Sequence, residues 1–80
     1  MVTPDMVKGY IVAGLQCEHI EVEGDGQHFY ATIVSPEFRG LMLVRQQQKV
    51  YAVLGDRMKA EIHALSMKTY TPEKWAELSK

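Results

Sequence analysis

The sequence contains one cysteine, no long apolar run and almost no net charge. Because the lone cysteine, Cys17, cannot form a disulfide within the chain, a reducing compartment is favoured over secretion. Apolar runs of only a few residues fall far short of the about 20 residues that cross a bilayer. The first ten residues also lack the basic and apolar regions of a secretory signal. We therefore expect a cytoplasmic protein without a membrane segment.

The chain is short and has no repeat, linker or low-complexity stretch. Its 80 residues leave room for one domain, residues 1–80. A domain of this size buries only about 60% of the surface of its unfolded chain. The hydrophobic content of 46% and the formal net charge of −1 favour a folded chain over a disordered one. Because such a thin core leaves little room for a deep cleft, we do not expect an enzyme.

The small net charge hides an uneven distribution of charge along the chain. Residues 1–38 contain one basic and six acidic side chains, a net charge of −5. Residues 39–59 contain five basic side chains and one acidic one, a net charge of +4, and residues 60–80 are balanced. Such an asymmetry bears on the partners of a protein rather than on its fold.

The first half of the sequence predicts a helix followed by a β-hairpin. A Thr-Pro-Asp capping sequence begins the predicted helix over residues 4–15, whose apolar positions recur at spacings of three and four. Residues 18–23 alternate between polar and apolar, as expected of a strand with one buried face. The turn-forming residues 24–27 and the β-rich segment 28–35 complete the hairpin.

The second half predicts a helix over residues 41–54, a short helical turn over 57–61, a strand over 62–69 and a terminal helix from residue 72. An apolar stripe is expected to bury one face of the first of these helices: Leu43, Val44, Val50, Tyr51 and Leu54. Each strand alternates and each helix has one apolar face. We therefore predict an α+β sandwich, a three-stranded sheet with helices on one face.

Few residues suit nucleophilic or phosphate chemistry. Cys17 and His19 stand two residues apart, as a thiolate nucleophile and its base would on one strand, but no third residue orients them. A small buried thiol is the favoured interpretation. No Gly-x-Ser-x-Gly sequence occurs, and the glycines at 24 and 26 precede a strand rather than a phosphate-binding helix. These absences also argue against an enzyme.

A structural zinc site needs four cysteine or histidine ligands at tight spacing, and the three histidines and one cysteine of this chain do not provide that spacing on their own. His28 and His63 each open a predicted strand, so the two can lie together at one edge of the sheet. A metal site completed by the thiolates of a partner therefore stays open. The alternative is that both are ordinary surface or hydrogen-bonded histidines.

The basic middle of the chain is a second candidate site. Arg39 precedes the predicted second helix, and Arg45 and Lys49 lie one turn apart on it, so all three can reach phosphates. Gln46 and Gln48 carry amides that are able to contact base edges. The alternative is an ordinary solvated helix face, which the low net charge favours.

Three segments resemble the BolA-like family. Residues 62–75, IHALSMKTYTPEKW, resemble its C-terminal signature, a His-Ala-hydrophobic-Ser strand followed by Thr-Pro-x-x-Trp. Residues 26–29, GQHF, resemble its Ser-His-Phe hairpin element, with glutamine in place of serine. Residues 38–51 resemble its Phe-x-Gly stretch followed by Arg and Val-Tyr, and their Gln-Gln form is similar to the bacterial IbaG branch. The resemblance covers essentially the whole chain.

The resemblance implies a class II KH-like fold with the order αββααβα, and a non-enzymatic role in iron–sulfur cluster handling. Members of the family pair with monothiol glutaredoxins and share a bridging [2Fe–2S] cluster, to which the histidine matching His63 contributes. A second ligand usually comes from the hairpin loop, but residues 24–27 contain neither histidine nor cysteine, which leaves His28 or Asp25. No cluster is expected on the chain alone, which the resemblance makes a monomer or weak homodimer.

The resemblance also implies an alternative role. Some BolA-like proteins are stress-related transcription regulators that bind DNA through the helical region matching residues 39–49. The candidate contacts in this chain are Arg39, Arg45 and Lys49. The Gly-x-x-Gly loop with which KH domains grip nucleic acid is absent from the sequence.

Overall fold

Four helices and three strands follow one another in the order that the sequence predicts. The computed structural model describes residues 2–80, and its elements are α1 (Pro4–Gly14), β1 (His19–Gly24), β2 (His28–Val34), the 3-10 turn η1 (Pro36–Phe38), α2 (Leu43–Leu54), α3 (Arg57–Ala60), β3 (Ala64–Tyr70) and α4 (Pro72–Leu78). The third strand begins two residues later than predicted, because Ile62 turns into the core and its amide bonds the Arg57 carbonyl. Within the described chain, no helix has the length and apolar character needed to cross a membrane.

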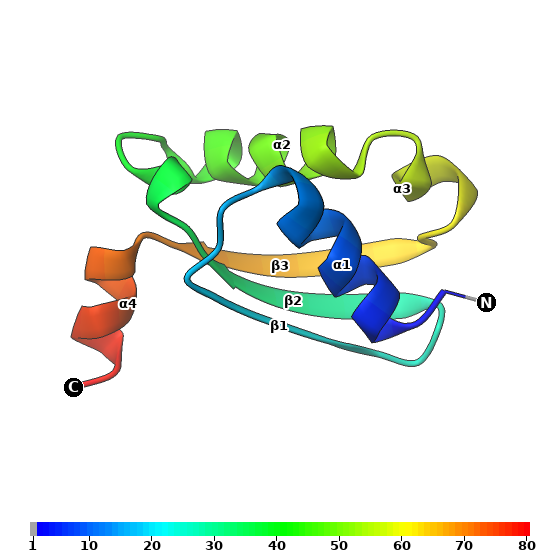
Figure 1. Ribbon diagram of the computed structural model, residues 1–80, viewed down its shortest axis with the longest axis horizontal. Coiled ribbons are helices and arrows are strands. Elements are labelled where there is room, and N and C mark those ends of the chain that lie inside the picture. Colours follow the sequence, from blue (N-terminus) through cyan, green and yellow to red (C-terminus); the bar gives the residue numbers. More distant parts are fainter. Residues whose placement is uncertain (1) are drawn as a thin grey trace.

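The strands form one mixed sheet in the order β1-β2-β3 (Figure 1). β1 runs antiparallel to β2, with Gly24 opposite Phe29, and β2 runs parallel to β3, with His28 opposite Ala64. The end of β1 and the beginnings of β2 and β3 therefore meet at one end of the sheet. The predicted α+β architecture is confirmed.

The core lies between one face of the sheet and the helices α1 and α2, which Figure 1 shows against it. Its buried side chains include Val7, Ile11, Leu15, Phe29, Ala31, Ile33, Phe38, Val50, Leu54 and Ile62. The two helices approach closely at Gly14, where a Cβ atom would lie 2.8 Å from a methyl group of Val53. A side chain at this position would force Val53 or the helices themselves to shift.

The apolar stripe predicted for α2 is wrong at three of its five positions. Val50 and Leu54 are buried as predicted, but Leu43, Val44 and Tyr51 are exposed by 60%, 56% and 40%. With Leu41 and Met42, the first two of these residues form an exposed apolar segment over residues 41–44.

A glutamine explains why the stripe was misplaced. The face of α2 that contacts the rest of the protein runs through Gln46, Val50, Val53 and Leu54, at the i, i+4, i+7 and i+8 spacing of one helix face. Gln46 holds this position because its Oε1 accepts a hydrogen bond from the Thr69 hydroxyl at 2.6 Å, and its amide nitrogen donates to a loop carbonyl at 2.9 Å. A polar residue, Gln46, thus lies on the face of α2 that contacts the rest of the protein, where the hydrophobicity pattern predicted apolar residues.

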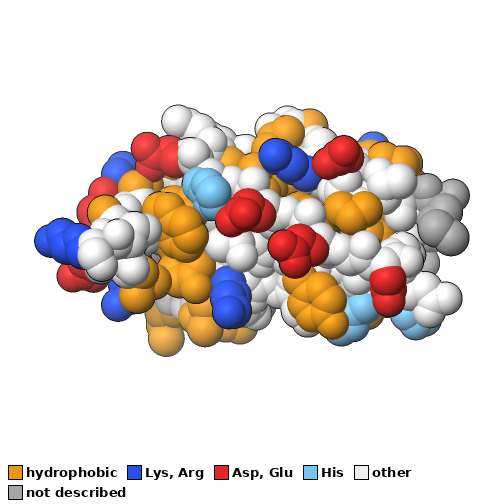
Figure 2. Space-filling model, turned by 90° about the horizontal axis from the view of Figure 1, so that it is seen from below, with side chains coloured by type: hydrophobic (Ala, Val, Ile, Leu, Met, Phe, Trp, Pro, Cys, Tyr) orange, Lys and Arg blue, Asp and Glu red, His pale blue; other side chains and the backbone are white. Residues whose placement is uncertain are grey.

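The opposite face of the sheet is covered only at one end, by α4. Trp75 of this helix stacks on His19 at 5.0 Å between ring centroids and lies 5.4 Å from the ring of Tyr70. The rest of that face, here called the open face, has no helix over it and consists of Glu21, Glu23, His28, Tyr30, Thr32, Ser66 and Lys68. Figure 2, viewed from below Figure 1, shows acidic side chains and histidines on this side of the molecule.

Candidate functional site

The parallel pairing of β2 and β3 brings His28 and His63 to the same end of the sheet. His28 opens β2 and lies opposite Ala64, the residue that follows His63. The amide of Ala64 also donates to the Gln27 carbonyl at 3.0 Å, which ties the start of β3 to the turn over residues 24–27. The prediction that the two histidines lie at one edge of the sheet is confirmed. We call this region, His28, His63 and residues 24–27, the histidine end.

His63 is the least constrained of the three histidines. His19 bonds Glu21 and His28 bonds Ser66. The ring of His63 is exposed and forms no hydrogen bond within residues 2–80. An exposed imidazole without a partner in the described chain leaves its nitrogen lone pair available to a ligand from outside.

His28 is held in place by two neighbours on the open face. Its Nε2 atom lies 3.0 Å from the Ser66 hydroxyl oxygen, and its ring stacks on Tyr30 at 4.4 Å between centroids with 12° between the planes. Histidines that bind metals commonly use one ring nitrogen for the metal and anchor the other by a hydrogen bond. In the tautomer in which Nε2 carries the proton and donates to Ser66, the other nitrogen, Nδ1, is the one able to act as a ligand.

Asp25 builds the turn at this end. Its Oδ1 atom accepts hydrogen bonds from the amides of His28 and Gln27, both at 2.9 Å, while Gly26 adopts a left-handed φ of 99°. The hydrogen bond from the His28 amide, followed by that from Gln27, lowers the pKa of the Asp25 carboxyl. This geometry explains the conformation of the turn and engages one of the two oxygens that a metal would use.

The histidine end offers at most a partial ligand set. Within residues 2–80, no three histidine, cysteine, aspartate or glutamate side chains come together in a way that could hold a metal ion. His28 and His63 supply two imidazoles, and an iron or zinc centre needs four ligands. A metal centre here would take the remaining ligands from a second protein.

Cys17 and His19 do not form a nucleophile and base. The thiol of Cys17 lies 3.4 Å from the Leu15 carbonyl, and His19 pairs instead with Glu21 at 2.8 Å. Burial raises the pKa of the Cys17 thiol, and the carboxylate of Glu37 raises it further. A thiol that stays protonated is a poor nucleophile, which favours the buried structural thiol.

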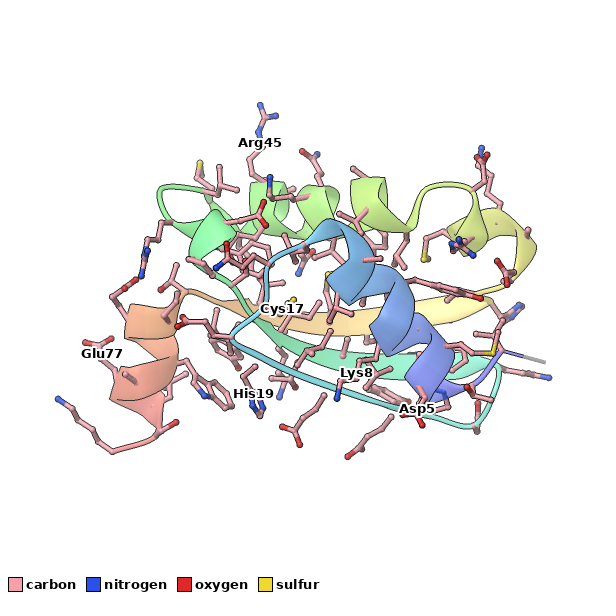
Figure 3. The ribbon with its side chains drawn as sticks, in the orientation of Figure 1. Asp5, Lys8, Cys17, His19, Arg45 and Glu77 are labelled. Atoms are coloured by element: carbon pink, nitrogen blue, oxygen red, sulfur yellow. The ribbon has the colours of Figure 1, made fainter. Side chains whose placement is uncertain are left out.

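The structure separates the three predicted phosphate contacts. Arg39 binds both carboxylate oxygens of Glu73, the shorter contact being 2.6 Å, and these hydrogen bonds lower the pKa of the Glu73 carboxyl. Lys49 lies 3.5 Å from a carboxylate oxygen of Glu37. Of these three, only Arg45 is without an ion pair in the described chain, and Figure 3 shows it pointing away from the body of the protein.

The amides singled out beside these bases also differ. Both polar atoms of the Gln46 side chain form hydrogen bonds, the oxygen with Thr69 and the nitrogen with the loop before α2. The side chain is therefore not available to a base edge. Gln48 is exposed. The basic region thus presents one unpaired base next to the exposed apolar segment 41–44, rather than a row of three bases.

Sequence reasoning missed the residues that position His28. Tyr30 and Ser66 lie 36 positions apart in the numbering, yet they are opposite each other in the register of β2 and β3. Side chains alternate between the two faces of a strand, so Tyr30, two residues after His28, lies on the same face as that histidine. This alternation is the signal that the sequence offers. The parallel register, which brings Ser66 within reach of the ring, is not encoded in any local pattern.

Comparisons with known proteins agree with this fold. The family profile described as BolA-like protein matches residues 12–74. The chain is 37% identical over 71 residues to the acid stress protein IbaG of Escherichia coli (strain K12), which covers 88% of this chain and 84% of that protein. It is 35% identical over 57 residues to the DNA-binding transcriptional regulator BolA of Haemophilus influenzae, covering 71% of this chain and 55% of the regulator.

A solved structure gives the same result in three dimensions. The structure of a BolA protein homologue from Coxiella burnetii matches this chain with a TM-score of 0.83 and 42% sequence identity, covering 95% of this chain and 99% of that one. The matched region includes both strands that begin at the histidine end. The fold, the sequence motifs and these matches together establish that the chain belongs to the BolA-like protein family.

Proposed function

We propose that this chain is a non-enzymatic adaptor in iron–sulfur cluster handling. It pairs with a monothiol glutaredoxin, and a [2Fe–2S] cluster bridges the two proteins. His63 is the main ligand from this chain and His28 the second. The observation that carries the proposal is the exposed ring of His63, without a hydrogen bond within residues 2–80, at the same end of the sheet as a histidine whose orientation is already fixed.

The donor set fits such a cluster. Iron in [2Fe–2S] clusters accepts histidine nitrogen in place of thiolate, and this raises the reduction potential and makes the bond sensitive to protonation. His63 and His28 would hold the iron on this side, and Ser66 would keep the His28 ring in one orientation. The thiolate ligands that complete the set would come from the partner's side of the pair, its single active-site thiol and a further thiol bound with it, because Cys17 lies away from the histidine end with a raised pKa.

A binding role also agrees with the finding that Cys17, the candidate nucleophile, is not activated. Cys17 is protonated and partly buried, so the part of this chain is to bind and orient rather than to react. Thiolates survive best in a reducing compartment, which is why we assign the pair to the cytoplasm.

The test uses the visible spectrum of the cluster. A glutaredoxin is loaded with its cluster, this protein is added, and absorption and circular dichroism are recorded. We expect the wild type to change the spectrum and His63→Ala to lose that change. His19→Ala is the matched control, because His19 stacks on Trp75 at the other end of the sheet. A His63→Ala spectrum identical to that of the wild type would show that the ligand assignment is wrong.

The second ligand is tested in the same way. His28→Ala removes the imidazole, whereas Ser66→Ala removes only its hydrogen-bond partner. We expect His28→Ala to change the spectrum more than Ser66→Ala does. If instead His28→Ala has no effect and Asp25→Ala alters the spectrum, the carboxylate is the second ligand.

DNA binding is the second candidate function. It is favoured by the name of the Haemophilus influenzae relative, a DNA-binding transcriptional regulator, and by the exposed Arg45 on α2. It is opposed by the pairing of Arg39 and Lys49 with carboxylates. Counterion release requires that DNA affinity falls steeply with salt and that Arg45→Ala reduces the slope. Affinity that is independent of salt would rule out this role.

A further inference from the structure

The open face carries a large aromatic side chain that the fold leaves uncovered. Tyr30 lies in the middle strand, and 55% of its surface is exposed. Its ring is fixed by the stack on His28, at 4.4 Å between centroids. Exposed tyrosines of this kind dominate the binding energy of many protein interfaces, because they bury a large area at a small cost in conformational entropy.

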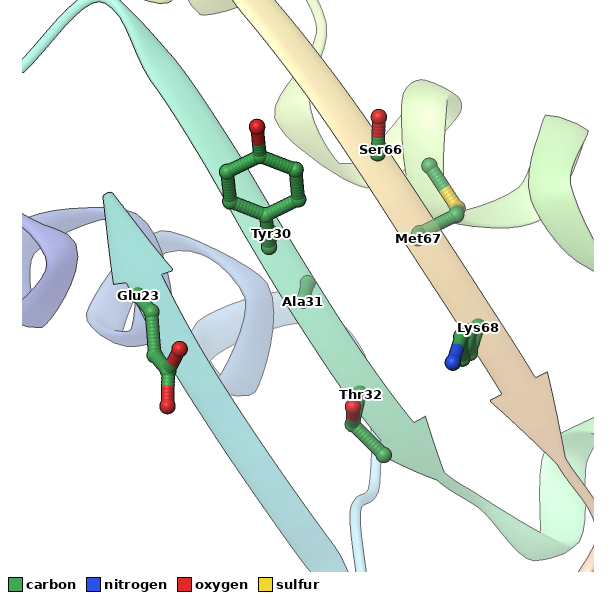
Figure 4. Close-up of a pocket in the computed structure, with 7 residues that line it drawn as sticks. All are labelled: Glu23, Tyr30, Ala31, Thr32, Ser66, Met67 and Lys68. Atoms are coloured by element: carbon green, nitrogen blue, oxygen red, sulfur yellow. The ribbon is translucent and has the colours of Figure 1, made fainter. Parts of the chain in front are cut away.

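A hollow of about 360 Å³ lies beside Tyr30 on the same face. Figure 4 shows Tyr30 and Ser66 toward one end of it, Thr32 and Lys68 toward the other, and Glu23 reaching in from β1. Its volume is at the lower end of small-molecule pockets. Because it is a depression in a sheet surface, we assign it to a protruding side chain of a partner protein.

The charges around the hollow favour a partner with a basic rim. Glu23 on β1 has no ion pair within residues 2–80, Glu21 beside it pairs with His19, Asp25 follows in the turn, and Lys68 is the one lysine or arginine of the open face. These carboxylates would repel a phosphate backbone. Two copies of the chain placed face to face would bring like charges together, which disfavours self-association here. Lysine or arginine side chains opposite Glu23 suit the face.

The open face is continuous with the histidine end. His28 belongs to both, because its ring bonds Ser66 and stacks on Tyr30. Figure 2 shows histidine side chains at the lower right edge of this view. A protein that reaches His28 from this side therefore covers Tyr30 as well.

A second hollow, of about 500 Å³, lies on the other side of the histidine end and is the competing surface. It has no aromatic lining, and its residues are Val2, Met6, Gly26, Gln27, Ala60 and Glu61. The carboxylate of Glu61 already accepts hydrogen bonds from the hydroxyl of Tyr10 at 3.0 Å and from Arg57 at 3.4 Å. This side therefore offers neither an aromatic anchor nor a free charge.

We propose that the partner that supplies the cluster thiolates docks across the open face, with Tyr30 as its anchor and basic side chains opposite Glu23. A partner side chain fills the hollow between Tyr30 and Lys68. The inference rests on the proposed function for the identity of the partner, but it concerns a contact that does not need the cluster.

The experiment measures binding of the cluster-free protein to a cluster-free monothiol glutaredoxin by titration calorimetry, and then binding of the loaded pair. We expect Tyr30→Ala to weaken binding at least about tenfold and Tyr30→Phe to retain it, because the ring and its stack remain. Glu23→Lys should weaken binding at low salt, with a smaller effect at high salt. Tyr51→Ala is the matched control, since Tyr51 is also exposed, by 40%, but lies on α2.

The outcomes separate this inference from the proposed function. If Tyr30→Ala and Glu23→Lys bind as the wild type does, loaded or not, while His63→Ala still loses the cluster spectrum, the docking surface is wrong and the cluster role stands. If the wild type forms no cluster-bridged pair at all, the proposed function fails. Sedimentation that shows a homodimer abolished by Tyr30→Ala, or DNA binding abolished by it, would assign the face to a different occupant and overturn the inference.

Discussion

At the end of the sheet where β2 and β3 begin, the ring of His63 forms no hydrogen bond in the described chain, whereas at the other end two pairs of polar side chains link different elements. There Thr69 bonds Gln46, and Arg39 binds Glu73 through two oxygens. We call this second region, the ends of β2 and β3 with η1, α4 and the start of α2, the α4 end. We therefore expect the α4 end to contribute more to the stability of the fold, and our proposal assigns binding to the histidine end.

Core truncation at the α4 end should give the largest effect. Phe38 in η1 is fully buried, so Phe38→Ala should lower the free energy of unfolding by about 3–5 kcal/mol. His63→Ala should change it by no more than about 0.5 kcal/mol, because the ring is exposed. Urea unfolding followed by circular dichroism measures both. Leu43→Ala, at a position exposed by 60%, is the control at the α4 end. Equal losses in the free energy of unfolding for Phe38→Ala and His63→Ala would contradict the difference in stability between the two ends.

The hydrogen bond that replaces the predicted apolar contact of α2 should come next. Thr69 is 7% exposed, and Thr69→Val removes the donor to Gln46 while keeping the side-chain shape. We expect a loss of about 1–3 kcal/mol in the free energy of unfolding, with partial recovery in Thr69→Ser. Thr32→Val, on the open face, is the matched control and should be close to neutral. If Thr69→Val leaves the free energy of unfolding unchanged, water hydrogen-bonds to Gln46 as favourably as Thr69 does.

The dependence of stability on acid pH should show the smallest of these effects. It also distinguishes the histidine end from the α4 end. The pKa values of Asp25, at the histidine end, and Glu73, at the α4 end, are both lowered in the folded state. A lowered pKa means that the folded state binds fewer protons than the unfolded chain. The stabilisation is therefore complete above the ordinary pKa near 4 and is lost as the pH falls through the lowered value.

Variants and salt separate the two contributions. Asp25→Ala and Glu73→Gln should each flatten part of the fall in stability below about pH 4. High salt should remove the part due to Glu73, because its ion pair with Arg39 is exposed, and should leave most of the part due to the backbone hydrogen bonds of Asp25. An acid profile that is identical in both variants and the wild type would contradict the assigned cause.

Much of the fold follows from local patterns. The Thr-Pro-Asp start of α1 is confirmed in detail, since the Thr3 hydroxyl accepts a hydrogen bond from the Met6 amide. The β-rich segment 28–35 does form a strand, and its alternation puts Phe29 and Tyr30 on opposite faces, one fully buried and the other 55% exposed. These elements depend on neighbours close in sequence, so periodicity and capping residues are enough to locate them.

The features that sequence reasoning missed depend on contacts between distant residues. The polar bond between Gln46 and Thr69 shifted the buried face of α2, and a hydrophobicity pattern has no means of showing it. The pairing of Arg39 with Glu73 likewise turned a predicted phosphate contact into a link to α4. The location of His28 and His63 could be predicted because it required only that both histidines open neighbouring strands.

The position of Trp75 has a practical consequence. It is the only tryptophan in the chain, and it stacks on His19 and lies beside Tyr70 at the α4 end. The intrinsic fluorescence of the protein therefore comes from an indole that reports whether α4 is docked. Because this indole lies at the opposite end of the sheet from His28 and His63, its emission should stay nearly constant when a partner is captured and change when the C-terminal helix detaches. The protein thus contains its own optical probe for separating binding from local unfolding.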